Sequence, residues 1–144
     1  MRYPEVREFS PEDMLAIPFN PALNVEGTRE DLLEWGRGHK EAGPCVSMTL
    51  DGEVYASGGF RFLNPSGVAE IWTTVRCNSP CGVVIAIRRQ MREWVRDHSI
   101  KILISLVLPG WEGGKRFAEW MGFKDSGDTC LMNDINYHVY MRAS

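Results

Sequence analysis

The 144-residue sequence lacks any long apolar run and any strong excess of charge of one sign. It carries 16 basic and 19 acidic residues for a net charge of -3, so no overall field attracts nucleic acid or an anionic membrane. Charged and proline-containing sequence follows Met1, without the apolar segment of a signal peptide or a spanning helix. We therefore predict a cytoplasmic protein with neither a nucleic-acid partner nor a membrane partner.

Cysteine is also scarce, with four residues in the chain: Cys45, Cys77, Cys81 and Cys130. So few cysteines do not make a disulfide scaffold, and a cytosolic setting keeps them reduced. Cys77 and Cys81 lack the two-residue spacing of a zinc knuckle, and no histidine is near them in the sequence, so no metal site is predicted. Cys45 with His39 suggests a nucleophile and a base, but a lone cysteine at the start of a strand is typical of a small buried side chain.

Length and composition indicate one domain over residues 1–144, because a chain of this size with 44% apolar residues buries a single large core. Val6–Phe9 is predicted to be a short strand. Ser10 and Pro11 then begin a brief helix, with a hydroxyl cap, a proline in the first turn and acids after it. A proline- and asparagine-containing loop follows over 18–24, and a second helix capped by Thr28 runs to Ala42.

From Cys45 the pattern changes to strands. Cys45–Leu50 and Glu53–Leu63 flank Asp51-Gly52, which is a signal for a two-residue hairpin turn. A second turn over 64–67 leads to Val68–Val75, which is rich in β-branched and aromatic residues. The sequence therefore predicts three consecutive antiparallel strands.

The last third of the chain predicts alternating helices and strands. Ser79 and Pro80 are the expected cap and first turn of an amphipathic helix whose apolar residues, including Trp94, recur at helical spacing. The apolar run 100–108 is typical of a central strand. A helix with Trp120 on its core stripe follows and ends at Gly122, and strands begin at Phe123 and Asn136. Together these elements predict a mixed α/β domain.

Three of these pieces, in this order and spacing, resemble the GNAT superfamily of N-acetyltransferases over residues 45–124. They are the strand 69–75, the loop and basic helix after it, and the stretch 117–124 with its Gly122-Phe123 pair. The resemblance implies a mixed sheet of about seven strands with helices on both faces. It also implies a split between the fourth and fifth strands that receives the pantetheine arm of acetyl-CoA or another acyl-CoA.

The resemblance places the cofactor at the helix that follows the fourth strand. A helix N-terminus offers unpaired amides and a partial positive charge to a pyrophosphate. The family's loop reads Gln or Arg, two residues, Gly, any residue, then Gly or Ala, and of its two glycines this chain keeps only Gly82. A capped helix start without a ligand is the alternative interpretation. The predicted cofactor-binding residues are Val75, Arg76, Gly82, Val83, Val84 and Arg88.

Glu70 occupies the fourth-strand position from which family members supply a general base. By strand alternation it shares a face with Trp72 and Thr74, where desolvation raises the pKa of a carboxyl group. An exposed, inert carboxylate at the rim of the sheet is the alternative. The family's usual acid, a tyrosine, is replaced by Ala118. Thiolate release can also proceed without an acid, because thiols ionise near pH 8 to 9.

Two functions follow from the resemblance. The first is an acyl-CoA-dependent N-acyltransferase whose acceptor is a small-molecule or protein amine, bordered by the loops 20–26 and 110–114 and flanked by Trp72 and Trp111. The second is a non-catalytic GNAT-like scaffold, as in some phage-encoded, virion-associated proteins. The altered glycine loop and Ala118 favour this scaffold. A homodimer that binds another small ligand through its tryptophans is a third possibility.

Overall fold

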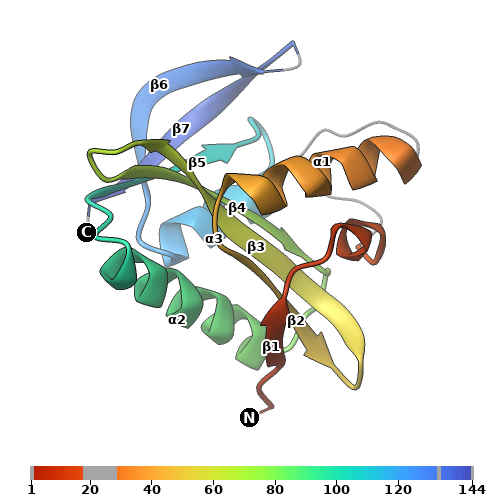
Figure 1. Cartoon of the computed structure of the whole chain (residues 1–144). Coiled ribbons are helices and arrows are strands. Elements are labelled where there is room, and N and C mark those ends of the chain that lie inside the picture. Colours follow the sequence, from red (N-terminus) through yellow and green to blue (C-terminus); the bar gives the residue numbers. More distant parts are fainter. Residues whose placement is uncertain (1, 18–28, 133, 144) are drawn as a thin grey trace.

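The computed structural model describes residues 2–17, 29–132 and 134–143. Its centre is a seven-stranded sheet in the order β1-β2-β3-β4-β5-β7-β6 (Figure 1). All neighbours pair antiparallel except β4 and β5, which are parallel. The mixed sheet confirms the predicted fold class. The strands are β1 Glu5–Glu8, β2 Cys45–Leu50, β3 Glu53–Asn64, β4 Val68–Val75, β5 Ile102–Val107, β6 Lys124–Met132 and β7 Ile135–Ala143.

Helices cover both faces of the sheet, as predicted. The 3-10 helix η1 (Pro11–Leu15) and α1 (Arg29–Ala42) lie on one face, which we name the α1 face. The helices α2 (Cys81–Asp97) and α3 (Glu112–Trp120) lie on the other, the α2 face (Figure 1). Within the described ranges, no helix is both long and apolar enough to cross a membrane.

The sheet buries side chains on both faces, so there are two hydrophobic clusters where the sequence predicted one core. Along β4, Ala69 packs against α2 and α3 while Trp72 packs against α1, because successive side chains of a strand point to opposite faces. The larger cluster lies on the α2 face and includes Phe60, Met91 and Leu103. The smaller lies on the α1 face and consists of Phe9, Met14 and Trp72, with Leu32, Trp35 and Cys45 against it.

The local predictions hold best where a turn residue determines the backbone. Asp51 and Gly52 have φ values of 53° and 80°, which a tight hairpin turn requires, and β2 and β4 have the predicted bounds. The first strand is shifted by one residue, and the brief helix after Ser10 is a 3-10 helix. The predicted loop at 18–24 and the cap at Thr28 lie outside the described residues.

Two predictions about helices are wrong. Ser79 does not cap α2: its hydroxyl donates to the Arg76 carbonyl at 2.6 Å, and the helix begins only at Cys81, after Pro80. The serine therefore closes the turn that follows β4. Trp120 is not a core residue but is 40% exposed, because α3 turns Ala118 and Met121 toward the sheet. Gly122 ends α3 as predicted, with a φ of 96°.

Candidate active site

The two parallel strands at the centre of the sheet part after three residue pairs. β4 is paired with β5 at Val68, Ala69 and Glu70, although β4 continues to Val75 and β5 to Val107. Beyond Glu70 the facing edges of the two strands therefore have no ladder hydrogen bonds to each other. Backbone amides and carbonyls on such edges are available to an extended ligand.

Glu70 lies at the point where the strands part. Its side chain is 13% exposed, so the exposure that the alternative interpretation assumed is not found. It points to the α1 face, as the alternation of β4 predicts, and accepts a hydrogen bond of 2.8 Å from Nη2 of Arg61. Arg61 is directly opposite on β3. Register between neighbouring strands thus provides the carboxylate with a cation that the sequence analysis did not identify.

His39 joins this group from the last turn of α1. Its ring stacks on Trp35 with 3.6 Å between centroids and meets the Trp72 ring edge-on at 5.4 Å. Nδ1 of His39 lies 3.0 Å from the Trp35 carbonyl. A carbonyl only accepts, so Nδ1 carries the proton and Nε2 keeps a lone pair. Burial lowers the pKa of His39, although the charge of Glu70 opposes this effect, and the ring is neutral at pH 7.

The same cluster contains two buried N–H donors without a hydrogen-bond partner among the described residues. They are Nε of Arg61 and Nε1 of Trp72. A buried donor left unpaired costs about 1–3 kcal/mol, and native proteins usually satisfy such groups with water or a ligand. A carboxylate, a guanidinium, a neutral imidazole and two indoles therefore share the α1 face at the parting of β4 and β5.

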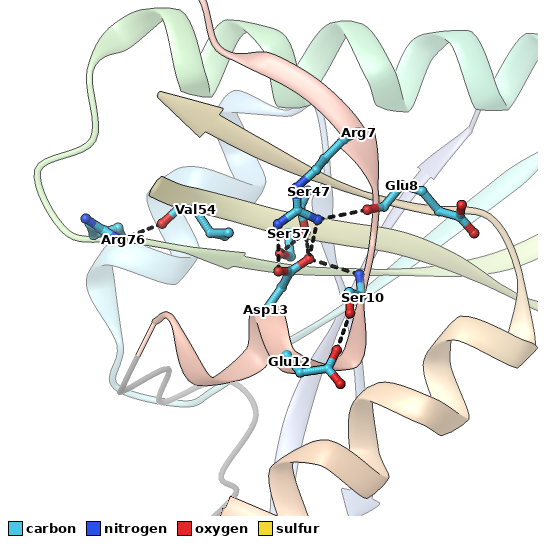
Figure 2. A network of polar contacts seen from close by, with 9 residues as sticks. All are labelled: Arg7, Glu8, Ser10, Glu12, Asp13, Ser47, Val54, Ser57 and Arg76. Atoms are coloured by element: carbon cyan, nitrogen blue, oxygen red, sulfur yellow. Dashed lines mark hydrogen bonds and ion pairs between the residues drawn. The ribbon is translucent and has the colours of Figure 1, made fainter. Parts of the chain in front are cut away.

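A polar network next to this cluster ties η1 to the sheet (Figure 2). The buried Asp13 accepts two hydrogen bonds of 2.8 Å from Arg7, one of 2.6 Å from Ser47 and one of 2.9 Å from the Ser10 amide. Burial alone would raise the pKa of Asp13, but the donors outweigh it and the pKa is lowered. Ser47 in turn bonds Ser57 at 2.7 Å. With four hydrogen bonds directed at an ion-paired carboxylate, this network is suited to structure rather than proton transfer.

The predicted cofactor residues lie in different places. Val75, Gly82, Val83 and Val84 gather at the end of β4 and the start of α2. Arg76 is near them, but its guanidinium donates to the Val54 carbonyl at 2.6 Å (Figure 2). The same guanidinium lies over the Tyr55 ring. Arg88 is farther along α2, with its guanidinium over the Trp120 ring of α3.

The backbone of Arg2 already packs against Gly82. A Cβ at this position would be only 1.8 Å from the carbonyl oxygen of Arg2, so the first residues of the chain cross α2 where only glycine fits. Val83 is fully buried, and its amide donates to the Pro80 carbonyl at 2.9 Å. The sequence predicted Gly82 as a cofactor-binding residue, and only the tertiary structure places Arg2 against it.

The described residues leave few candidates for an acid. Ala118 is buried in the main core. Tyr140 also belongs to that core, and burial raises its pKa and that of Tyr137. Tyr137 is three residues from Tyr140 on β7, so strand alternation directs it to the α1 face with Glu70. Cys45 packs in the smaller cluster, where burial raises the pKa of its thiol, as expected for a small buried side chain.

The structure also tests the remaining residues that the sequence singled out. The four cysteines are free. In the described part of the chain, no group of three or more His, Cys, Asp or Glu side chains gathers as a metal site requires. Trp111 precedes α3, where it packs over Gly114. The predicted acceptor loop 20–26 lies outside the described residues.

No protein-family model and no curated protein matches this sequence, but solved structures do match its fold. A GNAT-family acetyltransferase from Bacillus anthracis is 14% identical with a TM-score of 0.73, covering 99% of this chain and 95% of that one. AAC(6′)-Ib in complex with ribostamycin and coenzyme A is 14% identical with a TM-score of 0.72, covering 99% and 94%. A ribosomal-protein-S5-alanine acetyltransferase from Vibrio fischeri is 10% identical with a TM-score of 0.71, also covering 99% and 94%. At these identities the likeness shows a shared fold.

Proposed function

We propose that this chain, which has the GNAT fold, is an acyl-CoA-dependent N-acyltransferase that uses acetyl-CoA or a related donor. The observation that carries this proposal is the parting of β4 and β5 at Glu70. The parted edges offer backbone groups to a pantetheine arm, and the start of α2 lies at the open end. A carboxylate lies at the closed end, where an acyl group at the tip of that arm would be.

Glu70 is the proposed general base. In the reaction the acceptor nitrogen bonds to the acyl carbon and the bond from that carbon to the CoA sulfur breaks. Glu70 takes the proton that the ammonium must lose, directly or through water, and the thiolate leaves and takes a proton from solvent. Arg61 holds the carboxylate in place at 2.8 Å. The lone pair on Nε2 of His39 supplies a second acceptor on the same face.

The phosphates of the donor are assigned to the first turn of α2. Val75 contributes backbone at the parted edge of β4, and the amides of Gly82 and Val84 point toward the helix start. The amide of Val83 reaches the phosphates only if it leaves the Pro80 carbonyl. Because Arg2 already contacts Gly82, the proposal relies on amides rather than on close approach over the glycine. Arg76 reaches the phosphates only if it leaves Val54, and Arg88 only if it leaves Trp120.

The acceptor is proposed to be an amine on a small molecule or on a protein. One solved structure with a similar fold is in complex with the small molecule ribostamycin, and another is a ribosomal-protein-S5-alanine acetyltransferase. A screen for turnover therefore includes ribostamycin and a peptide with an N-terminal alanine, with release of the free CoA thiol as the readout.

Isothermal titration with acetyl-CoA tests the donor site first. We expect saturable binding to the wild type, unchanged binding to Glu70→Gln and binding weakened about tenfold or more by Val84→Asp, since a carboxylate repels the phosphates. Ser66→Asp adds the same charge at an exposed turn at the other end of β4 and is the matched control. In the acceptor screen, Glu70→Gln should lower kcat and leave acetyl-CoA affinity intact.

A non-catalytic scaffold is the competing function, and one observation favours it. The carbonyl of Arg2 occupies the surface of the glycine that the altered loop retains. A scaffold requires no donor, so absence of binding at millimolar acetyl-CoA would reject the transferase and leave the scaffold.

A further inference from the structure

Three arginine side chains approach one another beside the end of α3. Arg88 and Arg92 are one turn apart on α2, and Arg142 is on β7. The guanidinium carbon of Arg88 lies 4.9 Å from the centre of the Trp120 ring. Nε of Arg142 lies against Gly122, where an added Cβ would be 2.9 Å from it. Elements far apart in the sequence thus bring three positive charges to one place on the α2 face.

Within the described ranges these three side chains have no ion-pair partner, whereas several other arginines of the fold do. Arg7 pairs with Asp13, Arg37 with Glu30 and Glu34, and Arg61 with Glu70. Across residues 2–17, 29–132 and 134–143, none of Arg88, Arg92 and Arg142 forms an ion pair or donates a hydrogen bond to a protein group. Nε of Arg88 is also buried without a partner.

Such an arrangement is electrostatically unfavourable, and a bound anion would relieve the repulsion. Like charges four residues apart on a helix repel each other. Burial and the positive charges of Arg92 and Arg88 lower the pKa of Arg142. The carboxyl ends of α2 and α3 each supply roughly half a negative charge, which is too little to balance three guanidinium groups. Net positive charge therefore remains in a partly buried place.

We infer that Arg88, Arg92 and Arg142 form a binding site for a phosphate group, separate from the proposed donor site. The planar guanidinium group matches phosphate oxygens through two parallel N–H bonds, and a dianion balances three cations better than a single carboxylate does. Arg92 is exposed and admits the ligand, whereas Arg88 and Arg142 are half-buried. Arg92 is about 15 Å along α2 from Gly82 in the first turn.

Titration with inorganic phosphate at constant ionic strength tests this site. We expect saturable binding to the wild type and binding weakened about tenfold or more by Arg92→Gln and by Arg142→Gln, because each removes a charged donor pair. Arg89→Gln is the matched control, since Arg89 is on the same helix but lies over Tyr3. Absence of saturable binding, or an equal loss in Arg89→Gln, would overturn the inference.

Thermal unfolding shows whether the variants fold and provides a second readout. In phosphate-free buffer Arg142→Gln should melt at or above the wild-type temperature, because it relieves repulsion. Added phosphate should raise the Tm of the wild type and of Arg89→Gln but not that of Arg142→Gln. A phosphate-dependent rise of equal size in Arg142→Gln would also overturn the inference.

Free phosphate and the phosphates of acetyl-CoA share this chemistry, and a competition experiment separates the two sources. Phosphate binding should persist at saturating acetyl-CoA if the sites are separate, and its loss would show that the arginines belong to the donor site. Should acetyl-CoA not bind at all, the proposed transferase fails, while the phosphate titration and its variants still test the arginine site.

Discussion

Asp13 is the buried charge on which the docking of η1 depends. It has 8% of its side chain exposed, against 45% for its partner Arg7. Asp13→Asn keeps the shape but loses the charge that four hydrogen bonds use, so we expect a loss of about 2–3 kcal/mol in the free energy of unfolding. Urea denaturation near pH 7 measures it. Ser47→Ala removes one of these bonds and should cost about 1 kcal/mol.

The cost of Asp13→Asn should depend on pH. The pKa of Asp13 is lowered in the folded protein, so its contribution is complete above the unfolded value near pH 4 and disappears as the pH falls through the folded value. The difference between the wild type and Asp13→Asn should therefore shrink on acidification below about pH 4. A difference that stays constant down to the acid limit would contradict the ionised carboxylate.

His39 should make stability depend on pH in a higher range. Burial lowers its folded pKa, so the unfolded chain binds more protons as the pH falls from about 6.5. The wild type should lose stability from that point downward and level off below the folded pKa. His39→Gln should remove this slope, while His98→Gln, at an exposed position, should retain it. Urea unfolding over a pH series distinguishes these results, and an unchanged slope in His39→Gln would contradict the neutral ring.

At the scale of elements, α1 contains two glycines that test its docking to η1. A Cβ at Gly38 would meet nothing within 4 Å, whereas a Cβ at Gly36 would lie 3.0 Å from the Pro11 Cα and 3.2 Å from the Met14 side chain. Gly38→Ala should therefore stabilise the protein by about 0.5–1 kcal/mol through helix propensity. Gly36→Ala should destabilise it, because the backbone of η1 must move.

Chemical denaturation of both variants provides the comparison, with Gly38→Ala as the control for helix propensity. Equal stabilisation by the two substitutions would show that η1 does not pack closely on α1.

At the scale of the whole molecule, the two hydrophobic clusters should unfold together because they share one sheet. Met91→Ala should cost about 2–5 kcal/mol, since it enlarges a cavity of about 20 Å³ that Met91, Ile87 and Trp94 already line under α2. Circular dichroism and tryptophan fluorescence should both report this loss in one coincident transition. Trp94 lines the enlarged cavity, whereas Trp35 and Trp72 lie on the α1 face. A fluorescence transition that splits into a shifted and an unshifted step would therefore show that the α1 face unfolds independently.

The sequence predicted those features that depend on neighbouring residues. Alternation along β4 assigned Glu70 and Trp72 to one face, and Asp51-Gly52 determined the hairpin. The bounds of β2 and β4 followed from β-branched runs between turns. The prediction for Ser79 was wrong because a hydroxyl near a helix start can bond the preceding turn equally well, and Trp120 was placed in the core because helical spacing does not show how far a helix is rotated.

By itself, then, the sequence determined the order and type of the elements and the resemblance to the GNAT fold, because periodicity and turn chemistry are local. Only the tertiary structure decided which charges meet. Strand register pairs Arg61 with Glu70, helix docking brings His39 beside them, and chain crossing puts Arg2 on Gly82. The arginine cluster joins α2 to β7 across some fifty residues of chain, a juxtaposition that no spacing within a single element encodes.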